Sequence, residues 1–181
     1  PGLLLSLASC TTDWYFDLTE LSESVKYLDH VNLMTYDVGF STPYTVHHCC
    51  SRAMPAGIVT DGSAEENIRL FIEKGVPAEK LLIGGAFYSR MWSGVKDENH
   101  GLYAPAEVTS DYGPNYDELS LRYIDKNGYV RYWDDQAKAP WLYNGDVFIT
   151  YDDPQSLAEK CALVHQYHLR GIMAWESSSD S

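Results

Sequence analysis

Basic residues, paired cysteine motifs and long apolar runs are all scarce in this sequence, and each scarcity excludes a class of protein. The 181 residues include 13 Lys and Arg against 26 Asp and Glu, for a net charge of -13, and a surface of that sign repels phosphate backbones and anionic lipids. The four cysteines contain no CxxC pair and lack the density of a small disulfide scaffold. No apolar run approaches the ~18 residues of a membrane span. We therefore expect no nucleic-acid or membrane partner.

The run His47-His48-Cys49-Cys50 is the one local group of possible metal ligands. Neighbouring residues in an extended segment point to opposite sides, so four consecutive side chains do not converge easily on one ion. The sequence predicts neither a metal site nor a cofactor.

The first ten residues, PGLLLSLASC, have two interpretations. An apolar run that ends in small residues and Cys10 is similar to a lipoprotein signal, but it lacks an initiating Met and a basic segment. The run from Leu3 to Ala8 is also typical of a short buried strand. We favour the strand, which implies that the chain starts inside a longer protein.

Aromatic residues are plentiful, with 14 Tyr and 5 Trp. Their flat apolar faces and polar edges suit neutral sugars, and an acidic chain is compatible with such ligands. Packing in the core and between elements explains the same composition and is the simpler explanation when composition stands alone.

Helical and strand-like patterns alternate along the chain. Expected helices cover residues 17–28, 64–74 and 156–168, and expected strands cover 3–8, 31–36, 81–87 and 171–175. Capping-box signatures begin at Asp17 and Ser63, and Asp153-Pro154 combines an N-cap with proline at the first helical position. This alternation predicts an α/β fold with a parallel sheet, as a barrel or a doubly wound sheet.

Residues 88–147 break the alternation with Gly, Pro, Tyr, Trp and short alternating pieces such as Gly128–Trp133. That pattern is typical of a small inserted β-rich module. The expected organisation is therefore β/α units over 1–87, an inserted α+β module over 88–147, and the last helix and strand over 148–181.

The residues that end the expected strands are the candidates for chemistry, because barrel enzymes carry their active sites beyond the carboxyl ends of the strands. These candidates are Trp14, Tyr36-Asp37, Tyr88 with Arg90, and Trp175-Glu176. Adjacent strand residues face opposite sides, so Glu176 should point away if Trp175 faces the site, and we do not expect it to act as a catalyst.

Five segments together resemble family 18 glycoside hydrolases of the chitinase type. They are His30–Asp37 (HVNLMTYD), Leu81–Trp92 (LLIGGAFYSRMW), Tyr132–Asn144 (YWDDQAKAPWLYN), Phe148–Pro154 (FITYDDP) and Gly171–Glu176 (GIMAWE). They are similar, in order, to the strand-six and strand-seven motifs, two parts of the inserted module, and strand eight. The resemblance implies a partial TIM (β/α)8 barrel, the C-terminal half, with a small α+β insertion before the last strand. The family's acidic signature Asp-x-x-Asp-x-Asp-x-Glu, which ends strand four, is absent from these residues.

The resemblance also implies roles for individual residues. The parent protein would cleave β-1,4-linked N-acetylglucosamine by substrate-assisted catalysis, a known exception to the two-carboxylate scheme. Tyr36 and Asp37 would orient the acetamide group, and Trp175 would stack on the sugar ring. Two further matching positions, Tyr88 and Arg90, would bind sugar hydroxyls or carboxylates. Ser89 stands where the family usually has glycine.

Met34, within the Met-x-Tyr-Asp motif, is also expected to contact substrate. The other tryptophans could line outer subsites or pack under the module; they are Trp14, Trp92, Trp133 and Trp141.

Two functions remain open at this stage. The first is a secreted or cell-surface chitinase of which this chain, inactive alone, supplies the C-terminal part. The second is a non-catalytic lectin that binds chitin or N-acetylglucosamine. The expected partners are an N-acetylglucosamine-containing saccharide and the missing N-terminal half of the barrel, with self-association in its absence.

Overall fold

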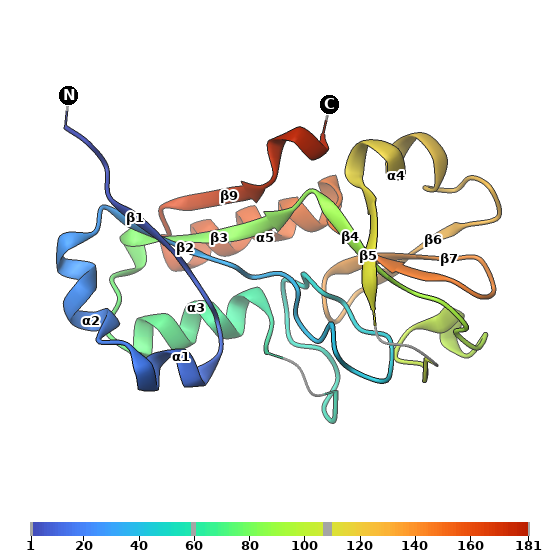
Figure 1. The fold of residues 1–181 in the computed structure, drawn as a ribbon, viewed down its shortest axis with the longest axis horizontal. Coiled ribbons are helices and arrows are strands. Elements are labelled where there is room, and N and C mark those ends of the chain that lie inside the picture. The colour runs from blue at the N-terminus through green and yellow to red at the C-terminus, as the bar shows by residue number, and fades with distance from the viewer. Residues whose placement is uncertain (1, 59–60, 107–109, 181) are drawn as a thin grey trace.

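The computed structural model describes residues 2–58, 61–106 and 110–180, whose strands form two sheets (Figure 1). The first sheet is parallel throughout, with the order β1-β2-β3-β9. Its strands are β1 Ser6–Ser9, β2 His30–Leu33, β3 Leu81–Ala86 and β9 Gly171–Trp175. Helical segments separate consecutive strands of this sheet, so the parallel β/α architecture predicted from the sequence is confirmed.

The helices follow the expected order along the chain. They are α1 Asp13–Leu18, α2 Leu21–Ser24, α3 Ala64–Glu73, α4 Tyr116–Arg122 and α5 Pro154–Tyr167, with 3-10 helices at Val25–Tyr27, Ala78–Lys80, Asn99–Gly101 and Ser177–Ser179. The capping box of Ser63 and Glu66 is present at the start of α3. Asp153 caps α5, and Pro154 opens it as predicted.

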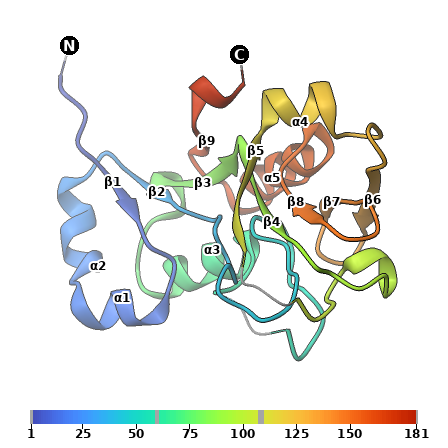
Figure 2. The same ribbon diagram turned by 45° about the vertical axis from the view of Figure 1, so that its right-hand side comes forward.

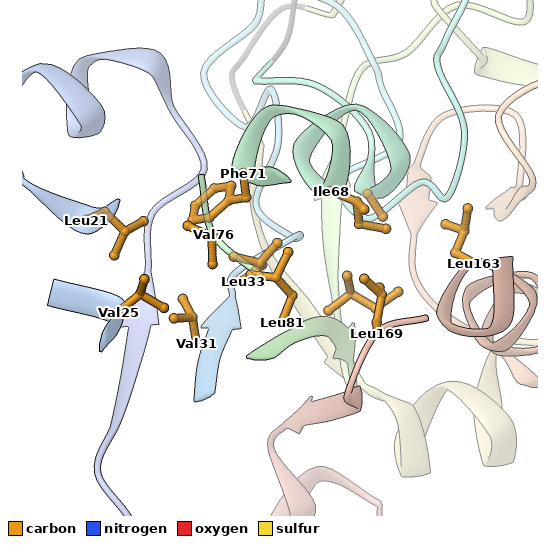
Figure 3. Close-up of a cluster of buried hydrophobic side chains, with 12 residues drawn as sticks. Leu21, Val25, Val31, Leu33, Ile68, Phe71, Val76, Leu81, Leu163 and Leu169 are labelled. Carbon is orange, nitrogen blue, oxygen red and sulfur yellow. The ribbon is translucent and has the colours of Figure 1, made fainter. Parts of the chain in front are cut away.

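The main core lies between the parallel sheet and its covering helices (Figure 3). Ile68 and Phe71 are buried on one face of α3, at the spacing of an amphipathic helix. They pack in one cluster with Leu33 and Leu81 from β2 and β3. Burying each of these large side chains contributes about 1.5–3 kcal/mol, so this face fixes α3 against the strands that carry the site.

The second sheet is antiparallel, with the order β5-β4-β8-β7-β6. Its strands are β4 Tyr88–Trp92, β5 Asp111–Asn115, β6 Val130–Asp134, β7 Ala139–Tyr143 and β8 Phe148–Thr150. Figure 2 shows this sheet beyond the carboxyl ends of the parallel strands. The expected boundary between residues 147 and 148 would separate β8 from this sheet, whereas β8 pairs with both β4 and β7.

The predicted helix over residues 17–28 is wrong in its start and its continuity. The helix α1 begins at Asp13, which places Asp17 inside it, and Thr19 is extended (φ -132°, ψ 145°) and ends it. A separate short helix follows Glu20, whose side chain makes no capping bond. Tertiary packing accounts for the shift, because the Phe16 ring lies 4.8 Å from that of Phe71 and fixes α1 against α3.

Three expected strands are shorter than predicted, and one of them, β3, loses a single residue because it ends at Ala86. β1 starts at Ser6, and Leu3, Leu4 and Leu5 are exposed rather than buried. Within the described residues β1 has only β2 as a neighbour, so its outer edge and flank are uncovered. β2 ends at Leu33, after which the chain turns toward the site.

None of the helices in the described part of the chain combines the length and apolarity needed to cross a bilayer.

Candidate active site

A cavity of about 660 Å³ opens at the carboxyl ends of β2, β3 and β9. It brings together five of the six residues singled out from the sequence as catalytic or substrate-binding. They are Met34, Tyr36, Asp37, Tyr88 and Trp175. Residues more than 130 positions apart in the chain thus face one space, as expected for parallel strands whose carboxyl ends share an edge.

Tyr36 is held in place by the preceding residue, Thr35, and by Gly84, on which its ring lies. The buried hydroxyl of Thr35 accepts a hydrogen bond from Gly84 N (2.9 Å) and donates one to Gly84 O (3.2 Å), which joins the end of β2 to β3. The Tyr36 ring lies directly on Gly84, where an added Cβ would stand 2.5 Å from Cε1 of the ring. Glycine is therefore required at position 84 for this placement of the ring.

Asp37 follows in a left-handed conformation (φ 62°) that aims its carboxylate at three polar neighbours. Arg90 donates from Nε to Oδ1 at 2.8 Å, and Nδ1 of His48 lies 3.8 Å from the same oxygen. Tyr88 lines the same cavity, and its hydroxyl interacts with the carboxylate. Burial alone would raise the pKa of Asp37, but the Arg90 guanidinium outweighs burial and holds the pKa well below its usual range. Asp37 is a fixed negative charge at neutral pH.

The two site tyrosines have the opposite shift. Burial, assisted by the neighbouring Asp37 charge, raises the pKa of Tyr36 to about 12. Burial also raises the pKa of Tyr88, and the neighbouring Asp37 carboxylate adds to this shift, so the Tyr88 pKa lies further above its ordinary value than that of Tyr36. Both hydroxyls therefore keep their protons at neutral pH, and the Tyr36 hydroxyl can donate to an acceptor in the cavity.

Arg90 lies behind Asp37 and is not among the residues that line the cavity. Its guanidinium stacks on the Tyr112 ring, 3.7 Å from the centroid, and lies 5.3 Å from that of Phe40. Asp37 offsets the effect of burial and raises the Arg90 pKa. Of the two roles expected for Arg90, the contact with a site carboxylate is the one present in this arrangement.

Trp175 ends β9 with 57% of its surface exposed, in the wall of the cavity. Glu176 lines the same cavity, contrary to the expectation that it would point away. Strand alternation does not govern Glu176, because β9 ends at Trp175 and the chain then enters a 3-10 helix at Ser177. Its carboxylate accepts a hydrogen bond from Ser178.

The remaining tryptophans have different surroundings. Trp92 and Trp141 are buried in the core of the antiparallel sheet, so packing is their role in this structure. Trp14 is exposed and lines a smaller cavity beside α1 and α3, away from Asp37. Trp133 is half-buried, with the Arg131 guanidinium over its ring.

Three residues of the candidate site escape the sequence patterns. Tyr112 (63% exposed) and Asn115, both on β5, line the cavity. Nothing in the sequence marks β5, because Gly113 and Pro114 interrupt any strand-like alternation. His48 belongs to the run His47–Cys50, which the sequence offers only as possible metal ligands. Its contact with Asp37, 11 positions away, forms only in the folded chain.

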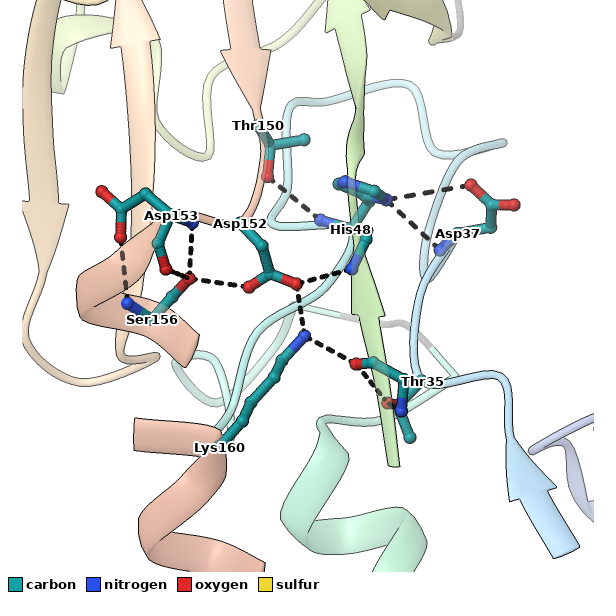
Figure 4. A network of polar contacts seen from close by, with 10 residues as sticks. Thr35, Asp37, His48, Thr150, Asp152, Asp153, Ser156 and Lys160 are labelled. Carbon is teal, nitrogen blue, oxygen red and sulfur yellow. Dashed lines mark hydrogen bonds and ion pairs between the residues drawn. The ribbon is translucent and has the colours of Figure 1, made fainter. Parts of the chain in front are cut away.

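A buried charged pair lies beneath the site (Figure 4). Lys160 of α5 is fully buried and donates to Asp152 and, at 2.9 Å, to Gly84 O. Asp152 also accepts from Ala86 N (3.0 Å) and from the Ser156 hydroxyl (2.7 Å). The pair thus fixes the end of β3, from which Tyr88 follows. Burial would lower the pKa of Lys160, but Asp152 raises it, so Lys160 is charged.

Comparison with known proteins identifies the family of this chain. The family model for glycosyl hydrolases family 18 matches residues 1–180. Chitinase A1 of Niallia circulans is 34% identical over 98% of this chain and 28% of that protein.

Two solved structures are also similar. A family 18 N-acetylglucosaminidase from Paenibacillus barengoltzii superposes with a TM-score of 0.94 at 44% identity, covering 99% of this chain and 53% of that one. A chitinase-like agglutinin from Robinia pseudoacacia superposes with a TM-score of 0.83 at 30% identity, covering 100% of this chain and 52% of that one. The chain thus spans about half or less of the length of these relatives. It belongs to the glycosyl hydrolases family 18.

Proposed function

We propose that this chain is the C-terminal half of a (β/α)8-barrel hydrolase that cleaves β-1,4-linked N-acetylglucosamine, with the general acid supplied from outside these 181 residues. The convergence of Tyr36, Asp37 and Trp175 on one cavity carries the proposal. A stacking face, a neutral hydroxyl donor and a fixed carboxylate are the groups that an N-acetylated sugar requires. The relatives named chitinase and N-acetylglucosaminidase support the same substrate class.

The proposed reaction is substrate-assisted. The acetamide oxygen of the bound sugar attacks the anomeric carbon while an external carboxylic acid protonates the leaving glycosidic oxygen. Tyr36 donates to the acetamide oxygen and fixes its direction, and the Asp37 charge shapes the field around the acetamide and the carbon that becomes positive. Trp175 supports the apolar face of the ring. Water then opens the oxazolinium-like intermediate.

The other barrel half is the proposed partner of the open sheet edges. β1 and β9 are the outer strands of the parallel sheet in the described residues. Exposed apolar side chains lie beside or on these two strands and include Leu3, Leu4 and Trp175. Unpaired edges and apolar patches associate readily, so the chain alone should self-associate. Because polymeric chitin lies outside cells, we place the full-length protein there or at the cell surface.

Hydrolysis by the full-length protein tests the proposal. With chitotetraose as substrate, we expect shorter N-acetylglucosamine oligomers to form, while cellotetraose, which lacks the acetamide, stays intact. Chitotetraose binding without turnover would instead support the second candidate, a lectin, which the similarity to the chitinase-like agglutinin favours. Failure to bind chitotetraose would contradict both.

The Gly84→Ala substitution tests the placement of Tyr36. Because the new Cβ would stand 2.5 Å from the ring, the ring has to move, and we expect turnover of chitotetraose to fall about 10²-fold. Gly85→Ala is the matched control on the other face of β3, where the added Cβ meets the mobile end of Leu157 at 3.0 Å. Equal turnover by the two variants would show that the Tyr36 position does not matter.

A further inference from the structure

His48 lies beside Asp37, with a ring nitrogen turned toward it (Figure 4). Its side chain is fully buried, and Nδ1 lies 3.4 Å from the backbone nitrogen of Asp37 and 3.8 Å from the carboxylate oxygen Oδ1. The first contact is a long hydrogen bond from the Asp37 N–H, and the second is too long to be a hydrogen bond. The imidazole therefore accepts the Asp37 N–H and stands beside the carboxylate.

The backbone of His48 is anchored on both sides. Its N–H donates to the Thr150 hydroxyl of β8 at 3.3 Å, and its carbonyl accepts from Val38 N at 3.1 Å. The Tyr88 ring packs against the imidazole with centroids 5.3 Å apart. The antiparallel sheet thus fixes the position from which His48 reaches Asp37.

The imidazole makes no other side-chain hydrogen bond in the described part of the chain. Its Nε2 is buried with no hydrogen-bond partner among the described residues, and an unsatisfied buried group of this kind costs about 1–3 kcal/mol. Burial lowers the pKa of His48, and the positive charge of Lys160 lowers it as well. The negative charges of Asp37 and Asp152 raise this pKa but do not outweigh burial. An apolar side chain would avoid the cost at Nε2 but would leave the Asp37 N–H without its acceptor, so the contact with Asp37 is the reason that the structure offers for histidine here.

The hydrogen bond to His48 stabilises the backbone conformation of Asp37. Its left-handed backbone (φ 62°) is unfavourable for a residue with a side chain by roughly 1–2 kcal/mol and persists only where neighbours enforce it. Val38 N, the next backbone donor, is satisfied by the His48 carbonyl. His48 therefore binds two successive N–H groups, those of Asp37 and Val38, and holds this turn.

We propose that His48 is a positioning residue for the reaction: its neutral Nδ1 accepts the Asp37 N–H and keeps the Asp37 carboxylate between Arg90 and the cavity. The role in the reaction rests on the proposed hydrolase function. The hydrogen bond itself can be tested without that function.

His47 provides a matched control. It is adjacent and fully buried, but its Nε2 lies 3.2 Å from Asp134, and its ring packs against Tyr103 and Trp141 of the antiparallel module. Among the described residues, the hydrogen bond and ring contacts of His47 go to Asp134, Tyr103 and Trp141, so its replacement disturbs the fold without removing the proposed positioning contact.

The experiment compares His48→Asn, His48→Gln and His47→Gln in the full-length protein. Asn places an acceptor oxygen near the position of Nδ1, whereas Gln places its amide near Nε2. We expect His48→Gln to lower kcat about tenfold or more with KM within about twofold, and His48→Asn to stay within about threefold of the wild type in kcat. His47→Gln should lower the melting temperature and leave kcat unchanged.

The ¹⁵N signals of the His48 imidazole in the wild-type protein give a readout independent of turnover. We expect an unprotonated Nδ1 and a protonated Nε2 at neutral pH. A protonated Nδ1, or a His48→Gln variant with wild-type kcat, would overturn the proposal. If the wild-type protein does not hydrolyse chitotetraose, the hydrolase function fails, and the imidazole signals still decide whether His48 accepts the Asp37 N–H.

Discussion

Changing Tyr36 to Phe should lower the turnover of chitotetraose by the full-length protein about 10²–10³-fold, the usual effect of losing one preorganised donor at a developing charge. The substitution removes a single hydroxyl and keeps the ring on Gly84. Since burial and Asp37 raise the Tyr36 pKa to about 12, the hydroxyl is a donor throughout the neutral range. Initial rates at saturating substrate measure the effect.

Tyr103→Phe is the control for this substitution. Its hydroxyl donates to Asp134 at 2.7 Å in the antiparallel module and does not line the cavity. We expect Tyr103→Phe to keep wild-type turnover. If Tyr36→Phe did so as well, Tyr36 would have no part in orienting the acetamide.

Replacing Lys160 with Met should destabilise the protein by about 3–5 kcal/mol, the range for removing one partner of a buried ion pair. Met has a similar length but leaves the Asp152 charge buried and Gly84 O without its Nζ donor. Adding Asp152→Asn to Lys160→Met removes the stranded charge and keeps an acceptor for Ala86 N. The double variant should therefore be more stable than Lys160→Met alone. Urea unfolding followed by tryptophan fluorescence gives these differences.

An exposed pair serves as the comparison for the buried one. Lys138 forms an ion pair with Asp135 at the surface, where solvent screens the interaction. Lys138→Met should leave the unfolding midpoint unchanged. A loss below about 1 kcal/mol for Lys160→Met would show that the buried pair does not fix the end of β3.

Short residue patterns correctly predicted two helix starts and one strand. The cap at Ser63, Asp153-Pro154 at the start of α5, and the strand Gly171–Trp175 all appear where the sequence indicates them. These features depend on neighbouring residues, which the sequence displays directly. By contrast, the capping signature at Asp17 failed because packing of Phe16 on Phe71 moved the helix start to Asp13.

The site divides in the same way. Tyr36, Asp37 and Trp175 end apolar strands, and the parallel arrangement brings them to one cavity. Tyr112 reaches that cavity from a strand with no periodic signal, and His48 reaches Asp37 across a loop of 11 positions. Such contacts depend on how the antiparallel sheet closes on the parallel one, which residue patterns along the chain do not encode.

Turnover of chitotetraose by the purified 181-residue chain, compared with its Tyr36→Phe variant, tests the central claim most directly. The cavity holds Tyr36, Asp37 and Trp175, to which we assign the acetamide and the sugar ring, and the signature Asp-x-x-Asp-x-Asp-x-Glu is absent from these residues. We predict no turnover by the chain above that of the variant, whereas the full-length protein is active. Turnover by the chain alone, abolished by Tyr36→Phe, would show that the proton donor lies within these residues and would contradict the account.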